Sequence, residues 1–315
     1  MKYLVNTDTD PHRNMAFDDY VLESLPLQEP VFYLWQNAPA VIIGLNQSAY
    51  AEVDLPYLEA HGIVLARRVT GGGAVYHDLG NLNYSFAGPL SAMEGAEGWM
   101  AQILQRLGVP AQRSGRNDIL VEGRKCSGYA KRLYKDRMMV HGTLMWDVDL
   151  EQLTAALAVP GSKLHAAGIA SVRSRVANLK DWLPQFPNLA AFQAALQGLL
   201  ADGDSEIPLS AAQKAEIDRL ADEKFRRWEW NFGHSPESAF VKERKFPCGT
   251  VRVRYNLRRG RLSELCFEGD FIGNRPASEL AQTLIGTRLE DLADVSVADY
   301  FDGMDAREFR TLFFG

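Results

Sequence analysis

The chain has 315 residues, 46% of them apolar, so it can form two domains with a sizeable core. Because its formal net charge is -6, nucleic acid is not expected as its main partner. Its three cysteines, Cys126, Cys248 and Cys266, lack metal-ligand spacing and are too few for a disulfide framework, as is usual in a reducing compartment. No apolar run reaches the roughly 20 residues that cross a bilayer, and no secretory signal is visible, so we expect a soluble, cytoplasmic protein without membrane contact.

The first 235 residues alternate between helical and strand-like patterns. Residues 14–25 place apolar side chains at helical spacing and predict an amphipathic helix. Further helices are predicted at 55–61, 91–108, 149–158, 189–201 and 209–227. Runs rich in β-branched and aromatic residues predict strands at 31–36, 40–47, 62–69, 74–77 and 82–86, and three more within 115–146. No strict βαβ rhythm is present, so we expect an α+β fold with a mixed, largely antiparallel sheet and flanking helices.

The character of the chain changes near residue 235, in a stretch rich in Gly, Ser and Pro. Residues 242–271 alternate along their length and contain glycine-based turns, which is typical of a small antiparallel sheet. Residues 277–304 predict one or two helices. We therefore expect two domains, residues 1–235 and a small α+β domain at residues 236–315.

The segment 67–81, RRVTGGGAVYHDLGN, places three consecutive glycines behind two arginines. A glycine costs roughly 0.5–1 kcal/mol in a regular element relative to alanine, so such a run indicates either a linker or a close approach of backbone to a ligand. Its strand-like flanks argue against a linker, and a plain hairpin turn is the simpler alternative. Backbone N–H groups beside Arg67 and Arg68 predict an anion site. The spacing matches neither a P-loop nor a dinucleotide fingerprint.

A second glycine-rich segment, SGRNDILVEGRKCSG at residues 114–128, places charges on a predicted hairpin with its turn at 122–123. Pairing across that turn would bring Asp118 close to Lys125, which could equally be an ordinary surface pair. Together the arginines, Lys125 and the glycine loop would hold a phosphate-bearing ligand, and Asp118 could hold Mg²⁺ through its oxygens. Because no nucleophile with a base partner is evident, we expect catalysis by positioning and electrostatics.

Five segments in succession resemble the motifs of the lipoate-protein ligase A family. They are RRVTGGGAVYHDLGN, GRNDILVEGRKCSG, HGTLMWDVDL, GIASVRSRVANL and WEWNFGHSP. They cover most of residues 1–235, and residues 236–315 resemble the family's C-terminal accessory domain. The resemblance implies the biotin/lipoyl ligase catalytic fold and a two-step reaction. The carboxylate of lipoate attacks the α-phosphate of ATP to give lipoyl-AMP, and an acceptor lysine then takes the acyl group and releases AMP.

The resemblance also implies partners and roles for single residues. Lys125 matches the catalytic lysine that touches both the α-phosphate and the acyl carbonyl, and Asp118 is the implied Mg²⁺ ligand. The implied ATP and adenylate contacts are Arg68, Gly73, Ala74, Val75, Tyr76, Asn117 and Lys125. The implied lipoate contacts are Lys125, Arg68, Gly72, Gly73 and His141. The implied acceptors are apo lipoyl domains of 2-oxoacid dehydrogenase E2 subunits and the glycine-cleavage H protein, and the implied state is a monomer.

Three further features bear on the site. Residues 163–175 resemble the family segment that closes over the adenylate, and their small residues suit a mobile lid. Residues 32–36 and 40–47 offer a wall for the fatty chain, although they could equally be ordinary core. Cys126, which follows Lys125, raises the alternative of an acyl-enzyme, but a buried cysteine behaves as a small apolar residue.

Other functions stay open beside the ligase. One is an ATP-independent transferase that takes octanoyl or lipoyl groups from acyl carrier protein, and another is a non-catalytic lipoyl- or biotinyl-binding module. A biotin ligase shares the fold but has a different glycine-loop signature. The combination of Arg68 with Lys125 and the accessory domain favour the ligase over the transferase, and a pure binder would not need Lys125 together with Asp118.

The accessory domain contains a basic stretch, with eight basic residues and one acidic residue between positions 242 and 261. Arg252 and Arg254 alternate, so they would share one face of a strand. This face is either a solvated edge that resists aggregation or a surface that steers an acidic acceptor domain.

Overall fold

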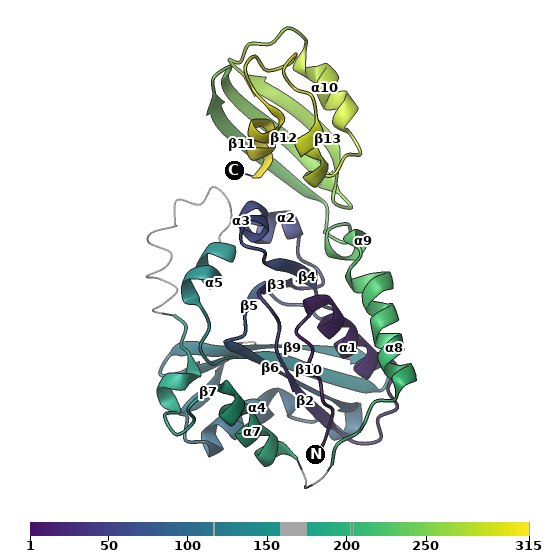
Figure 1. The fold of residues 1–315 in the computed structure, drawn as a ribbon, viewed down its shortest axis with the longest axis vertical. Helices are drawn as coiled ribbons and strands as arrows, with labels where there is room; N and C mark the ends of the chain where they lie inside the picture. The colour runs from purple at the N-terminus through teal and green to yellow at the C-terminus, as the bar shows by residue number, and fades with distance from the viewer. Residues whose placement is uncertain (116, 158–174, 202, 204, 315) are drawn as a thin grey trace.

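The structure, a computed structural model, describes residues 1–115, 117–157, 175–201, 203 and 205–314. Its larger part is built on a seven-stranded sheet with the order β1-β2-β6-β10-β9-β8-β7 (Figure 1). The strands are Lys2–Tyr3 (β1), Val31–Trp35 (β2), Asn81–Pro89 (β6), Ala111–Ser114 (β7), Asp118–Val121 (β8), Arg124–Tyr134 (β9) and Arg137–Met145 (β10). β1 and β2 run parallel, and the other neighbouring pairs run antiparallel. The expected mixed, largely antiparallel sheet is confirmed.

A second, three-stranded sheet carries the glycine-rich segment. It contains Ala40–Ile43 (β3), Val64–Arg67 (β4) and Val75–His77 (β5), in the order β4-β3-β5. β3 pairs in parallel with β4 and antiparallel with β5, so β4 and β5 are not neighbours. Residues 68–74 therefore pass across the end of β3, and the alternative of a plain hairpin turn is wrong.

The helix boundaries follow local capping. The first helix, Pro11–Glu23 (α1), begins before the predicted residue 14 because Asp10 accepts a hydrogen bond from His12 N and Pro11 occupies the first helical position. The predicted helix 91–108 is a 3₁₀ turn, Leu90–Ala92, followed by Ala96–Arg106 (α4), because Gly95 adopts a left-handed φ of 71°. The other helices are Ala49–Glu52 (α2), Leu55–Ala60 (α3), Leu150–Ala156 (α5), Leu189–Leu200 (α7), Ala211–Leu220 (α8) and Trp228–Asn231 (α9).

The seven-stranded sheet is covered on both faces, as Figure 1 shows. Alternate residues of β2 divide between two cores: Phe32 and Leu34 pack with residues of α4 and α7. Val31, Tyr33 and Trp35 pack with α1 on the opposite face. All five β2 residues are buried, which explains why this strand is an apolar run and does not alternate with polar residues.

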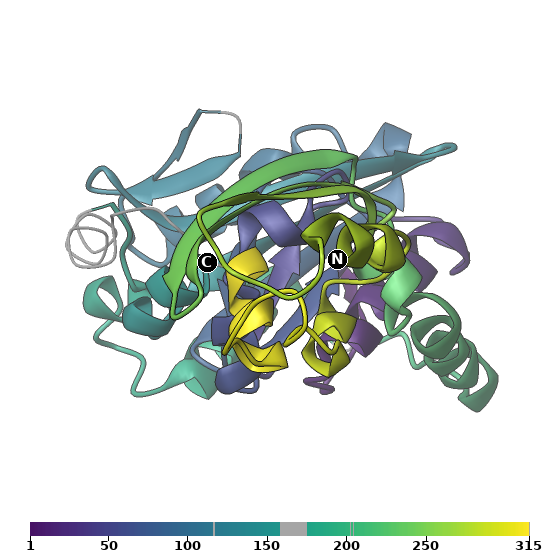
Figure 2. The ribbon, with the colours of Figure 1, turned by 90° about the horizontal axis from the view of Figure 1, so that it is seen from above.

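The C-terminal part is a separate three-stranded antiparallel sheet of Ser238–Phe246 (β11), Gly249–Arg258 (β12) and Arg261–Gly269 (β13), with helices Ala277–Leu284 (α10) and Ala306–Phe314 (α11). Figure 1 shows it at one end of the molecule, connected through α9, and Figure 2, seen from above, shows it in front of the larger part. Arg252 and Arg254 are exposed on one face of β12, as predicted, but each pairs with a glutamate on a neighbouring strand. The face is therefore less basic than the sequence suggested.

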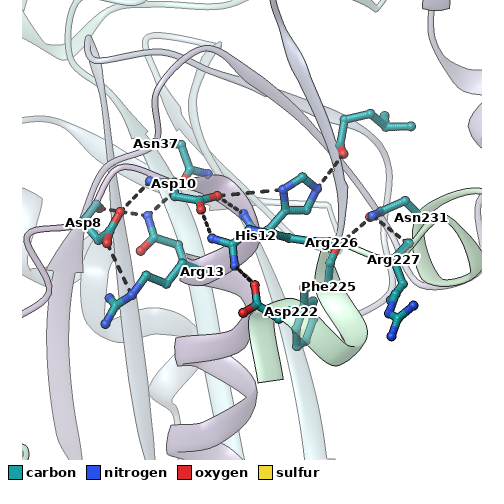
Figure 3. A network of polar contacts seen from close by, with 12 residues as sticks. Asp8, Asp10, His12, Arg13, Asn37, Asp222, Phe225, Arg226, Arg227 and Asn231 are labelled. Carbon is teal, nitrogen blue, oxygen red and sulfur yellow. Dashed lines mark hydrogen bonds and ion pairs between the residues drawn. The ribbon is translucent and has the colours of Figure 1, made fainter. Parts of the chain in front are cut away.

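Residues near the C-terminal end of the larger part form polar contacts with residues near its N-terminal end (Figure 3). Arg226, just after a π-helical turn at Ala221–Phe225, pairs with Asp10 and with Asp222. His12 contacts Leu65 O on β4 at 3.2 Å through its Nε2. These contacts fix the start of α1 against the segment that leads to the C-terminal sheet. Among the described residues, each helix is too short or too polar to span a bilayer.

Candidate functional site

A pocket of about 570 Å³, open solvent included, lies between the seven-stranded sheet and the smaller sheet. Seven of the ten predicted site residues line it, namely Arg68, Gly73, Ala74, Val75, Asn117, Lys125 and His141. Gly72, Tyr76 and Asp118 are not part of this lining. Most of the predicted site residues therefore border one pocket, and residues distant in the chain supply much of the remaining wall.

The floor of the pocket is one row of residues across four strands. The register places Trp35 of β2 opposite Asn83 of β6, and Asn83 opposite Thr143 of β10. Thr143 is joined in turn to Gly128 of β9, whose N–H donates to Thr143 Oγ1 at 3.2 Å. Residues opposite one another on antiparallel strands share a face, so the row forms a continuous surface. Lys125 stands at one end of it and Trp35 at the other.

Lys125 and Asp118 meet as the hairpin predicted. Lys125 Nζ lies 2.7 Å from Asp118 Oδ1, and both side chains are a little over one third exposed. Gly128 leaves room for the lysine head, because a Cβ at that position would stand only 3.0 Å from Lys125 Nζ. The pair is too exposed for a large contribution to stability. The pair instead holds the positive charge of Lys125 beside the pocket.

Arg68 is a buried cation that faces the pocket. It donates hydrogen bonds to Thr70 Oγ1, Ile42 O and the carbonyl oxygens of Gly71 and Gly73, at 2.7 to 3.3 Å. Burial lowers the pKa of Arg68 to about 10, which leaves it charged at neutral pH. Within the described part of the chain, no carboxylate forms an ion pair with it. A buried cation without a counter-charge is a site for an anion.

Arg67, by contrast, does not belong to the anion site. Adjacent residues of a strand point to opposite sides, and Arg67 is fully buried away from the pocket. Its guanidinium donates to six backbone carbonyl contacts and to the hydroxyl of Ser235. The carbonyl acceptors are those of Gly44, Leu45, Gln47, Trp230 and Asn231, the last contacted twice. The prediction that both arginines hold the ligand is therefore wrong for Arg67, which has a structural role.

His141 connects Arg68 to a buried carboxylate. Its Nδ1 lies 2.6 Å from Asp18 Oδ2, and its Nε2 lies 2.7 Å from Thr70 Oγ1. Because Asp18 also accepts from Tyr33 and Ser85, it acts as the common acceptor, and the His141 proton lies on Nδ1. Thr70 can then donate to His141 Nε2 while accepting from Arg68. This chain of hydrogen bonds fixes the orientation of Arg68.

Sequence analysis missed Asp18, Thr70, His77 and Asn83. Asp18 had a signal, because Asp18 and Asp19 interrupt the apolar pattern of the first helix and both are buried. His77 lies within the glycine-rich segment, is 3% exposed and lines the pocket. Burial lowers the pKa of His77 to about 3, so it is neutral at pH 7. Asn83 had no signal in the sequence, since it lies in a run that resembles an ordinary strand.

Three predicted features have mixed outcomes. Cys126 is buried and its Sγ contacts Ile119 O at 3.4 Å, and burial raises the pKa of its thiol to about 12, so it is not an activated nucleophile. Tyr76 turns its side chain away from the pocket and donates to Gln152 Oε1 at 3.0 Å. The predicted lid at 163–175 lies outside the described residues except for Arg175, whose carbonyl accepts from Lys125 N at 2.7 Å.

A metal ion at Asp118 would need further oxygen ligands from a bound phosphate compound and from water. No cluster of three or more His, Cys, Asp or Glu side chains that could hold a metal is present among the described residues. Mg²⁺ is commonly held by one or two carboxylates together with phosphate oxygens and water, so a single carboxylate beside an anion pocket fits it. Asp118 is a carboxylate of this kind, 2.7 Å from Lys125 Nζ.

Comparison with known proteins identifies relatives. Residues 10–200 match the lipoyl protein ligase A/B catalytic domain, and residues 235–313 match the bacterial lipoate protein ligase C-terminus. Lipoate-protein ligase 1 of Staphylococcus aureus is 36% identical over 98% of each chain. Among solved structures, a bipartite lipoate protein ligase of Thermoplasma acidophilum, studied with its E2 lipoyl domain, has a TM-score of 0.67 and 30% identity, and the match covers 75% of this chain and 97% of that one. A lipoate-protein ligase A bound with ATP has a TM-score of 0.64 and 29% identity over 74% and 98% of the two chains.

Proposed function

The chain belongs to the lipoate-protein ligase family, and on that premise we propose how its residues perform the reaction. It is an ATP-dependent lipoate-protein ligase, an enzyme that activates lipoate as lipoyl-AMP and transfers the acyl group to a lysine of a lipoyl domain. The catalytic-domain match, the curated ligase relative and the ATP-bound structural neighbour support this function. The transferase and binding-module alternatives are not favoured.

The assignment of the ligand site depends mainly on the surroundings of Arg68. Arg68 is a buried cation without a carboxylate partner among the described residues, and it lines the same pocket as Lys125. Such a cation needs an anionic ligand to compensate its desolvation. ATP, lipoate and lipoyl-AMP are all anions. We therefore assign the head of the acyl group and the α-phosphate to the end of the pocket between Arg68 and Lys125.

In the first step two anions must come together, and their repulsion is the main barrier to be lowered. Lys125 and Arg68 place positive charge on either side of the reacting carboxylate and phosphate, and this charge matters most in the crowded transition state. The backbone of Gly73, Ala74 and Val75 borders the phosphate, with Asn117 beside it. We assign the backbone of Gly72 and Tyr76 to contacts with the same bound anion. His141 acts indirectly, because its hydrogen bond to Thr70 positions Arg68.

In the second step Lys125 polarises the acyl carbonyl of lipoyl-AMP while the acceptor lysine attacks the acyl carbon and AMP departs. Asp118, paired with Lys125 at 2.7 Å, keeps Nζ oriented before the ligand enters. Mg²⁺ held by Asp118 and by phosphate oxygens would neutralise charge on ATP. Among the described residues, we assign Asp118 alone as its protein ligand in this arrangement.

The acceptor is a lipoyl domain, by analogy with the relative studied together with its E2 lipoyl domain. We extend the acceptors to 2-oxoacid dehydrogenase E2 subunits and glycine-cleavage H protein. We also propose that the enzyme acts as a monomer and in the cytoplasm, where its three free thiols would stay reduced. The boundary at residues 235/236 lies next to the start of the C-terminal family match and remains our proposed division of the chain.

The test is the intact mass of an apo lipoyl domain incubated with the enzyme, Mg²⁺ and lipoate, with and without ATP. We expect a lipoyl mass gain that requires ATP and falls at least about 100-fold in rate for Lys125→Ala, because the cation acts in both transition states. Lys131→Ala is the matched control, since Lys131 lies on the same strand and pairs with Glu97 away from the pocket.

Two outcomes would contradict the proposed activity, and a third would contradict the proposed mechanism. Acylation from octanoyl carrier protein with no need for ATP would make the enzyme a transferase. Tight binding of lipoate without any mass gain would leave only the binding module. Equal rates for Lys125→Ala and the wild type would keep the ligase activity but remove Lys125 from the mechanism.

A further inference from the structure

The outer edge of β11 presents unpaired backbone groups. Within the described part of the chain, β11 lies at the end of the C-terminal sheet and pairs with β12 alone. Phe246 and Gly249 close a two-residue hairpin loop, so these two residues exchange their N–H and C=O groups across the strands. Alternation then directs the backbone groups of every second residue of β11 away from β12, namely those of Ala239, Val241, Glu243 and Lys245. We call these four positions the β11 edge.

The β11 edge is open to another strand. Among the described residues, no backbone hydrogen bond is made by the N–H or C=O groups of these four positions. All four side chains are exposed, and that of Val241 is apolar and 63% exposed. An edge strand with free backbone groups pairs with a further strand unless charges or packing prevent it. The side chains of β11 therefore decide which strand can be added.

These side chains are mainly basic. Lys242, Arg244 and Lys245 surround one acid, Glu243, whose charge is already paired with Arg252. No carboxylate forms an ion pair with Arg244 within the part of the chain that the structure describes. Like charges opposite one another destabilise a strand pair, whereas opposite charges stabilise it. A second copy of this basic strand is therefore disfavoured, and an acidic strand is favoured.

The β11 edge lies beside the elements that support the pocket. Burial lowers the pKa of Lys242, and the negative charge of Asp54 opposes this effect, so the middle of β11 lies near the start of α3. Asp54 N donates in turn to Ala156 O of α5 at 3.3 Å. Residues of α3 and α5 pack in one apolar cluster with Val41 and Tyr76 of the smaller sheet. Figure 1 shows α3 between β11 and α5.

We propose that the β11 edge is the docking site of the acceptor, which adds an acidic strand of its lipoyl domain to the C-terminal sheet. This rests on the proposed function, because a ligase must hold the lipoyl domain while the acceptor lysine enters the pocket. Backbone pairing supplies affinity, and the basic side chains of β11 select an acidic strand. Arg252 and Arg254, which the sequence suggested for this role, are already paired with glutamates.

The experiment separates docking from chemistry. Adenylation is followed by lipoate-dependent exchange of pyrophosphate with ATP in the absence of acceptor. Transfer is followed by mass gain of an apo lipoyl domain at increasing concentrations. Val241→Pro removes an outward N–H but no hydrogen bond to β12, and proline is tolerated on the outer side of an edge strand. Val241→Ala is the matched control, since it removes most of the side chain and keeps the N–H.

We expect Val241→Pro to raise the KM for the lipoyl domain at least about tenfold, because the proline ring and the missing N–H oppose addition of a strand. Val241→Ala should remain within about twofold of the wild type. Pyrophosphate exchange should be unchanged in both variants, since residues of β11 do not line the pocket.

A second pair of variants tests the charge of the edge. We expect the combined change Arg244→Gln and Lys245→Gln to raise the same KM roughly fivefold at low salt and to approach the wild type at high salt, because salt screens exposed charges. Arg258→Gln is the matched control, since Arg258 is exposed on β12, away from the outer edge. Its KM should follow that of the wild type at both salt concentrations.

An unchanged KM in folded Val241→Pro would overturn the proposal. Glu243→Pro blocks the same edge and serves if the melting temperature shows that Val241→Pro is unfolded. A wild-type dimer that Val241→Pro converts to a monomer would assign the edge to a second copy, and this would overturn the proposal as well. In both cases the wild type still acylates the lipoyl domain, so the ligase function stands. Absence of any mass gain with the wild type would instead contradict the proposed function.

Discussion

The role of each polar side chain at this site follows from the hydrogen bonds that its atoms make. Asp18 accepts hydrogen bonds from Tyr33, Ser85 and His141, and it is 1% exposed. Only an ionised carboxylate can accept all three, because an amide would turn a donor toward at least one of these groups. The position of Arg68 thus depends on a residue that does not itself contact the pocket.

Asp18→Asn should destabilise the protein by about 2 kcal/mol, since one buried donor is left opposite another donor. Urea unfolding measures the change. Asp147→Asn is the control, because Asp147 is half exposed and pairs only with Lys180 in the described contacts, and we expect a change below about 0.5 kcal/mol. Equal stability of the two variants would show that the Asp18 network contributes nothing.

His77 makes stability depend on pH. Its pKa falls from 6.5 to about 3 on folding, because burial and the nearby Arg68 disfavour the charged ring. Between these two values the unfolded chain binds a proton that the folded chain does not, so the stability that His77 provides is complete above pH 6.5 and is lost as the pH falls. The slope is at most about 1.4 kcal/mol per pH unit.

We therefore expect His77→Gln to lose less stability than the wild type between pH 7 and pH 5, by roughly 1–2 kcal/mol. Urea unfolding of both proteins at the two pH values measures this difference. His61→Gln, at an exposed position on the surface, serves as the control and should follow the wild type. An identical pH response of His77→Gln and wild type would contradict the assignment.

At the scale of elements, the glycine loop is held by close packing against β3. A Cβ on Gly44 would stand 2.1 Å from Gly72 O and 3.2 Å from a guanidinium nitrogen of Arg68. The first of these atoms belongs to the backbone and cannot move away cheaply. The loop and the end of β3 therefore approach each other only because position 44 carries no side chain.

Gly44→Ala should displace the glycine loop, lower the melting temperature by several degrees and weaken ATP binding about tenfold or more. Differential scanning fluorimetry and calorimetric titration with ATP measure the two effects. Gly71→Ala is the stability control from the same loop, since a Cβ there meets nothing within 4 Å. If both variants melt at the same temperature, the close approach of the backbones does not matter for stability.

At the scale of the whole molecule, Arg67 connects the smaller sheet to the segment that leads to the C-terminal sheet. Its guanidinium joins the residues that follow β3 to residues 230–235, and Trp230 Nε1 donates back to Arg67 O at 2.8 Å. Figure 1 shows α9, the helix that contains Trp230 and Asn231, between the two parts of the molecule. The buried side chain of Arg67 thus joins the smaller sheet, which borders the pocket, to the segment that connects the two parts of the molecule.

Arg67→Met should cost about 3 kcal/mol or more, because several buried carbonyls would lose their donor. Arg219→Met, which removes an exposed arginine paired with Glu216 and Glu223, should leave the free energy of unfolding almost unchanged. Urea unfolding followed by tryptophan fluorescence compares the two. A small effect at Arg67 would mean that water replaces the guanidinium at these carbonyls.

The sequence by itself determined those features that depend on local patterns. The helices and strands, the change of character near residue 235 and the pairing of Asp118 with Lys125 follow from periodicity, turn residues and hairpin register, all of which act between near neighbours. For the same reason the glycine run predicted an irregular loop between strands, and its role in binding a ligand stays a prediction. The motif order was specific enough to identify the family.

Only the tertiary structure decided which charged groups face the pocket. Arg67 and Arg68 are adjacent and chemically identical, and the choice between them depends on residues 230–235, which lie far along the chain. His77 and Asn83 line the same pocket although they lie on strands of different sheets. Hydrogen bonds and burial among distant residues carry no periodic signal in the sequence, so the pairing of polar atoms becomes visible only when the chain is folded.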